Sequence, residues 1–183
     1  MPRPRTSRTR ERILATAPQL FARQAELLAL ELGRVEVAER LGVTKPALYY
    51  HFESRDALVR ALVQPLIDDV EAMLAEDEAA WHSSPRELLT RYFDISHRHR
   101  RIILLMTQDL ATVDELGVVQ RIVSWRSRLA ELLVGSGAGT ADRARAVVAL
   151  GGLGDCIVLL GDVDEAELRA AAVDAACSAL GVA

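Results

Sequence analysis

The sequence predicts an all-α protein of about nine helices. Leucine, alanine and valine dominate the composition, half of the 183 residues are hydrophobic, and only 4% are aromatic. Proline is scarce after Pro85, so long stretches lack the residue that most often interrupts a helix. Apolar residues also recur three and four positions apart, which is the spacing of one face of an α-helix.

The first helix is expected over residues 9–24. Ile13, Ala17 and Leu20 lie at helical spacing and would face the core. Pro18 falls in the middle of this segment. Because proline removes one backbone hydrogen bond, we expect a kink there.

Residues 37–52 predict two short helices joined by a tight turn. Gly42 stands where a left-handed residue can end the first of them. Thr44 can cap the second through its hydroxyl, and Pro46 falls in its first turn, where a missing N–H costs little. A helix-turn-helix places such a second helix in the major groove of DNA. The alternative is two packed helices of an ordinary all-α protein.

Six further helices are expected after this segment. Ser54 can cap the first, and Pro65 predicts either a hinge or a static kink about three turns into it. Ser84 and Pro85 can open the next. The remaining four are expected at residues 102–110, 114–134, 141–160 and 164–180, with a flexible loop at 135–139 and Thr140 as a cap.

Residues 37–52 resemble the DNA-binding domain of the TetR family of bacterial transcription regulators, chiefly in the run Leu-Gly-Val-Thr-Lys-Pro-Ala-Leu-Tyr-Tyr-His-Phe. Flanking residues 9–14, 20–23 and 54–58 extend the resemblance to roughly residues 8–62. It implies a helix-turn-helix domain in residues 1–53, with 1–8 as a flexible basic arm. Residues 54–183 would bind a ligand and dimerise. The implied function is a homodimeric repressor that a small molecule releases from a palindromic operator.

The resemblance also implies which residues touch DNA. Lys45, Pro46 and Ala47 stand where such proteins read bases: lysine can donate to a guanine edge, and the other two can pack on a thymine methyl. Tyr50 is alternatively a core residue, and His51 alternatively caps or packs. With three base readers per subunit, one half-site is poorly specified, so a dimer on palindromic double-stranded DNA is expected. The expected phosphate contacts are Arg34, Thr44, Tyr49, Tyr50, His51 and Arg55.

The net charge of −4 is unevenly distributed. Residues 1–60 hold eleven basic and seven acidic side chains, a balance of +4, whereas the remainder holds eleven and nineteen, a balance of −8. The arm ahead of the helix-turn-helix either tracks phosphates or is a solvated tail. The acidic remainder should point away from DNA.

Residues 25–33 depart from the family pattern. Ala25 replaces the usual glycine, no aromatic residue follows it, and the linker is about three residues too long. Gly33 occupies a capping position usually held by threonine or serine, which cap better. This departure motivates an alternative function: a TetR-like scaffold that has lost operator binding and acts as a sensing or protein-binding module.

The last two expected helices carry small residues in series, which let helices approach closely. We expect them to form a two-fold, four-helix dimer interface. The alternative is packing within one chain. The interface residues expected are Val147, Gly151, Gly154, Val158, Val173, Ala176 and Leu180.

Candidate residues for an effector pocket are polar or polarisable side chains within apolar helices. Each of them is alternatively a core residue. Asp155 stands out because a buried carboxylate needs a partner, either Arg126, Arg128 or a cationic ligand. The candidates are Tyr92, Phe93, Met106, Trp125, Asp155 and Cys156.

Other classes of protein have weaker support. No apolar run reaches the roughly 20 residues of a membrane span, and no secretory signal is visible, so a cytoplasmic protein without membrane contact is expected. Cys156 and Cys177 lack metal-ligand spacing and fit a reducing compartment. His97 and His99 suggest a catalytic or metal site, but residues two apart on a helix point in different directions. We therefore expect no enzyme activity, cofactor or metal.

Overall fold

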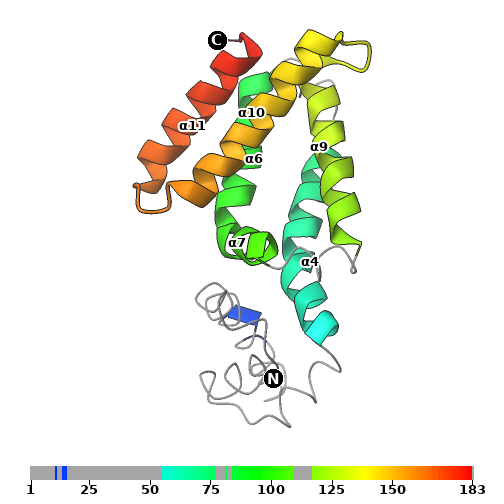
Figure 1. Ribbon diagram of the computed structural model, residues 1–183, viewed down its shortest axis with the longest axis vertical. Helices are drawn as coiled ribbons and strands as arrows, with labels where there is room; N and C mark the ends of the chain where they lie inside the picture. The colour runs from blue at the N-terminus through cyan, green and yellow to red at the C-terminus, as the bar shows by residue number, and fades with distance from the viewer. Residues whose placement is uncertain are drawn as a thin grey trace. The chain divides into compact units, whose positions relative to one another are not determined.

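The computed structural model describes Glu11 and residues 14–15, 55–76, 81, 84–108 and 117–182. Within these residues the chain contains helices, turns and loops but no strand, which confirms the all-α class. Glu11, Leu14 and Ala15 are helical and lie inside the first expected helix. The two helices of the expected helix-turn-helix lie outside the described residues, so the number nine stays a prediction. Six helices have defined bounds: α4 Arg55–Leu74, α6 Pro85–Arg98, α7 Arg100–Gln108, α9 Val118–Val134, α10 Thr140–Leu159 and α11 Glu165–Leu180 (Figure 1).

The chain divides into two compact units. The first comprises residues 1–65 and 101–116, and the second comprises residues 66–100 and 117–183. In the first unit, α4 buries Val59, Leu62 and Val63, while α7 buries Ile102 and Met106. The boundary within α4 falls directly after Pro65, although the helix itself continues from Arg55 to Leu74.

The second unit is built around α10. This helix packs against α6, α9 and α11, and α11 also packs against α6. In Figure 1 it runs between α9 and α11. Its inward face follows helical spacing, as amphipathic burial requires. That face consists of Ala146, Ala149, Leu150, Leu153 and Ile157.

The ends of α6 and α11 follow the signals in their sequence. Pro85 is the first residue of α6, where a helix tolerates a missing N–H. The Asp164 carboxylate accepts hydrogen bonds from the backbone N–H groups of Ala166 and Glu167, at 3.0 and 3.2 Å. Asp164 therefore caps α11 and satisfies two donors that the first turn leaves free.

Three expected helix starts are wrong. The helix expected from residue 102 begins at Arg100, as α7. We expected a helix over 114–134, but α9 begins at Val118 because Gly117 has a left-handed φ of 69°, which cannot continue a right-handed helix. We also expected Thr140 to cap α10, but the cap position is Gly139 and Thr140 is already helical. Both cap positions are glycines, so no side chain caps the start of α9 or of α10.

Candidate functional site

The residues expected to touch DNA fall almost entirely outside the described residues. Arg55 is described, as the first residue of α4. The divergent linker at residues 25–33 also lies outside the described part. The DNA contacts therefore stay predictions, namely Arg34, Thr44, Lys45, Pro46, Ala47, Tyr49, Tyr50, His51 and Arg55.

Four consecutive residues at the end of α6 and the start of α7 connect three other helices. Arg98 and His99 both bind the Asp69 carboxylate on α4, at 3.0 and 2.8 Å. His97 lies 3.4 Å from Glu165 on α11. Arg100 donates to the backbone carbonyl of Ile157 on α10, at 2.6 Å. We call residues 97–100 the corner.

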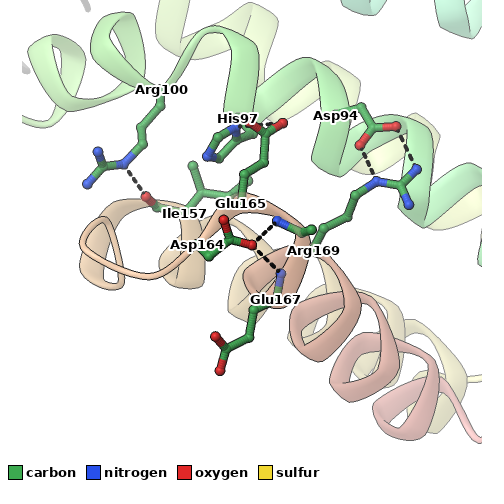
Figure 2. A network of polar contacts seen from close by, with 9 residues as sticks. Asp94, His97, Arg100, Ile157, Asp164, Glu165, Glu167 and Arg169 are labelled. Carbon is green, nitrogen blue, oxygen red and sulfur yellow. Dashed lines mark hydrogen bonds and ion pairs between the residues drawn. The ribbon is translucent and has the colours of Figure 1, made fainter.

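The corner continues into a set of polar contacts between α6 and α11, shown in Figure 2. The guanidinium of Arg169 on α11 binds both carboxylate oxygens of Asp94 on α6, at 2.6 and 2.9 Å. His97 approaches Glu165 at the first residue of α11. These exposed contacts fix how the two helices meet more than they add to stability, because exposed ion pairs contribute little.

The Asp69 carboxylate is held ionised by its partners. The hydrogen bond from His99 lowers the pKa of Asp69 most, desolvation by partial burial acts in the opposite direction, and Arg98 lowers it further. A carboxylate that accepts hydrogen bonds from cationic or donor side chains is stabilised in its charged form. The junction between α4 and α6 therefore depends on a charged Asp69.

The six effector-pocket candidates have different surroundings. Phe93 is fully buried, and its ring stacks on His97 with centroids 5.6 Å apart, so it serves the core. Asp155 is exposed on α10, so the expectation of a buried carboxylate was wrong. Met106 belongs to the first compact unit and the other five to the second. Trp125 and Cys156 are half-buried.

Tyr92 is the candidate with the clearest polar surroundings. Burial raises the pKa of its phenol, whereas the charge of Arg126 and a hydrogen bond with Ser96 act in the opposite direction. Ser96 is itself buried. The side chain of Arg126 on α9 is therefore close enough to the Tyr92 hydroxyl on α6 to influence its ionisation.

Arg126 also lines an open groove of about 430 Å³ between α9 and α10. Val123, Arg126 and Val134 line it from α9, and Arg143, Val147 and Leu150 line it from α10. Sequence reasoning missed this groove. No sequence signal could have found it, because which arginines of these amphipathic helices line a groove depends on how the helices pack.

The residues expected at a dimer interface divide between the two helices. On α10, Val147 is 59% exposed and Gly151, Gly154 and Val158 are partly exposed. On α11, the expected residues are buried within this chain, because that face of α11 packs against α6 and α10. The buried residues are Val173, Ala176 and Leu180.

Within the described residues, no group of three histidine, cysteine or carboxylate side chains is arranged to hold a metal ion. In that same part of the chain, no helix is long and apolar enough to cross a membrane. Cys177 is buried and Cys156 is half-buried, and both are free thiols.

Comparison with known proteins identifies the N-terminal segment. Residues 32–62 match the family described as bacterial regulatory proteins, tetR family. The chain is 51% identical over 51 residues to the tetracycline repressor protein class A from transposon 1721 of Escherichia coli. It is 40% identical over 78 residues to the tetracycline repressor protein class C of Escherichia coli. It is 28% identical over 120 residues to the HTH-type transcriptional regulator AcrR of Shigella flexneri.

These alignments cover 28%, 43% and 62% of this chain, and 19%, 30% and 54% of the respective relatives. The chain thus spans about half or less of the length of the curated relatives it matches. The matches show that residues 32–62 are similar to bacterial regulatory proteins of the tetR family.

Proposed function

We propose that this protein is a homodimeric transcriptional repressor that binds a palindromic operator and leaves it when a small molecule binds. The observation that carries the proposal is the family match over residues 32–62, because that segment contains every residue expected to touch DNA. The curated relatives named as repressors support the direction of regulation.

In this proposal Lys45 reads a base edge in the major groove, with Pro46 and Ala47 beside it. Lys45 is the single lysine in the sequence; the other 21 basic side chains are arginines. A lysine in the first turn of a helix opposes the helix dipole, so a nearby phosphate or base edge explains its placement. The remaining contacts hold phosphates and set the register.

The proposed dimer surface is the outward face of α10. Val148, Gly152, Asp155 and Leu159 follow one another three or four residues apart on that face, and Val148 and Leu159 are 63% and 75% exposed. Large exposed apolar side chains beside glycine are typical of a surface that another helix covers. The outward face of α11 adds Ala170, Ala171 and Ala175, which replace the buried residues first expected there.

Release requires that the effector bind the DNA-free form more tightly than the DNA-bound form. The alternative of a scaffold without operator binding has less support, because the family match includes the recognition segment despite the divergent linker before it.

The experiment that tests this function is selection of bound fragments from a pool of random duplex DNA. The proposal expects enrichment of a palindrome with half-sites about one helical turn apart, or a multiple of it, bound by two chains. Because lysine-selective reagents modify a single side chain here besides the N-terminus, the enriched fragment should also protect Lys45 from reductive methylation. Failure to enrich any sequence would contradict the proposal.

A further inference from the structure

The arginines of α9 and α10 fall into two groups. Three are paired with carboxylates: Arg121 with Glu71, Arg128 with Glu131 at 3.3 Å, and Arg145 with Asp142 at 3.0 Å. Arg126 and Arg143 form no ion pair with any residue in the described part of the chain, and both line the groove between the two helices.

The walls between these two cations are apolar. Val147 and Leu150 lie on α10 between the level of Arg143 and that of Gly151, and Val123 and Val134 face them from α9. Glu131 also lines the groove, but Arg128 neutralises it from outside. The groove therefore combines an excess of positive charge with an apolar floor. Its volume of about 430 Å³ is within the range of small-molecule sites.

Arg126 extends from α9, and its guanidinium reaches α10 at the level of Gly151. A Cβ at position 151 would lie 3.2 Å from Nη2 of Arg126, so the guanidinium rests against the backbone of α10 at that level. Arg143 is eight residues earlier on the same helix, which corresponds to about 12 Å along the axis at 1.5 Å per residue. The two arginines therefore belong to levels of the groove about 12 Å apart along α10, which favours a ligand with an acidic group at each end.

We propose that this groove is the effector site and that it takes an elongated organic dianion with an apolar middle. One acidic group binds Arg126, the other binds Arg143, and the carbon chain lies on Val147 and Leu150. The role as effector site rests on the proposed function, whereas the binding chemistry does not. A cationic ligand was one partner expected for Asp155. Because the Asp155 carboxylate is exposed and arginines line the groove, the ligand proposed here is anionic instead.

Calorimetric titration of the full chain with sebacate tests the binding chemistry. Sebacate is a straight-chain dicarboxylate whose extended length is close to the rise of about 12 Å between positions 143 and 151 of α10. We expect saturable binding, about tenfold weaker binding of decanoate, which lacks the second carboxylate, and no binding of decyltrimethylammonium. Equal binding of the ammonium compound, or no binding of sebacate at millimolar concentration, would overturn the proposal.

Three variants localise the site. Arg126→Gln and Arg143→Gln should each weaken sebacate binding about tenfold, because each removes one charge-assisted contact. Arg145→Gln, on the same helix but paired with Asp142, should leave the affinity unchanged. Since Arg143 is exposed, its substitution tests the site even if Arg126→Gln destabilises the fold. Unchanged affinity of Arg143→Gln for sebacate would contradict the assignment. So would sebacate binding that occurs only in chains dissociated from the dimer.

Operator binding measured without sebacate separates this inference from the proposed function. Operator binding without sebacate binding leaves the regulator intact and refutes the dianion site. Sebacate binding without operator binding supports the site and refutes the regulator. If both occur, sebacate should release the operator from the unsubstituted chain, and release should need a higher concentration in Arg143→Gln.

Discussion

The guanidinium of Arg100 fills the space that a side chain at Gly161 would need. A Cβ built on Gly161 would overlap the guanidinium of Arg100, which donates through Nε to the Ile157 carbonyl at 2.6 Å. Nη2 of Arg100 also reaches the Val158 carbonyl at 3.4 Å. Both carbonyls belong to the last turn of α10, where a helix leaves its acceptors free and favours a positive charge. The absence of a side chain at position 161 thus permits Arg100 to cap α10.

Substitution of Gly161 should therefore act through Arg100. Gly161→Ala forces the end of the flexible Arg100 side chain to shift and should lower the free energy of unfolding by at most about 1–2 kcal/mol, the usual loss for a hydrogen bond to a charged group. Arg100→Ala should cost a similar amount, and the double variant should cost little more than either single one, since both remove one interaction. Urea unfolding of the four proteins measures this.

Gly137→Ala is the matched control for that cycle. Gly137 also lies in a loop, a Cβ added to it would meet no atom within 4 Å, and its φ is not left-handed. Alanine there should be neutral or slightly stabilising, by less than about 1 kcal/mol. Additive effects of Gly161→Ala and Arg100→Ala would contradict the proposed link between the two residues.

The pair of Asp69 and His99 predicts a pH dependence of stability. The pKa of Asp69 is lower in the folded chain than its ordinary value of 3.8, chiefly because His99 hydrogen-bonds the carboxylate. A lowered folded pKa means that the stabilisation is complete above about pH 4 and is lost as the pH falls through the folded value. Asp69 is partly exposed, so we expect at most about 1 kcal/mol.

Urea unfolding of Asp69→Asn and the unsubstituted chain at pH 7 and near pH 3 tests this sign. The unsubstituted chain should be more stable at pH 7, and the difference should shrink toward zero at the lower pH. Asp142→Asn, in an exposed pair within one helix, should show little difference at either pH. A gap for Asp69→Asn that widens as the pH falls would contradict the account.

The two cysteines should differ in reactivity. Burial raises the pKa of the Cys177 thiol, and the residue is 1% exposed, so the thiolate is both scarce and inaccessible. In Cys156→Ala, alkylation by iodoacetamide should proceed only as fast as the chain unfolds. In Cys177→Ala, the half-buried Cys156 should react faster under the same conditions. Equal rates in the two variants would show that Cys177 is not protected.

The outward face of α10 predicts which substitution breaks the dimer. Val148→Glu places a charge on the proposed dimer surface and should yield a folded single chain in sedimentation equilibrium. Val123→Glu, at a valine of α9 that is equally apolar and 59% exposed, should remain dimeric. Retention of the dimer by Val148→Glu would move the interface elsewhere.

Local signals allowed the sequence to predict some elements well. The Ser84–Pro85 pair indicated the start of α6, although Ser84 makes no side-chain capping hydrogen bond, and the helix expected from residue 164 begins at Glu165 with Asp164 as its cap. Gly117 was harder, because its residue type does not reveal the left-handed φ that starts α9 at Val118.

The candidate sites could not be predicted at the same level. Helical spacing placed small residues on one face of each of the last two helices, but it could not say which face meets the rest of the chain. On α10 that face is partly exposed, whereas on α11 the corresponding Val173 and Ala176 are buried. Likewise, Asp155 and Arg126 could be distinguished only by the packing that exposes one and sets the other in a groove.

The most direct test of the central claim is operator affinity of the unsubstituted chain and Lys45→Ala at two salt concentrations, by fluorescence anisotropy with the selected palindrome. We predict affinity that falls steeply with salt, a loss of tenfold or more in Lys45→Ala, and relaxed preference at one base pair of each half-site. Arg145→Gln should bind as the unsubstituted chain does. Equal affinity and equal base preference in Lys45→Ala would contradict the account.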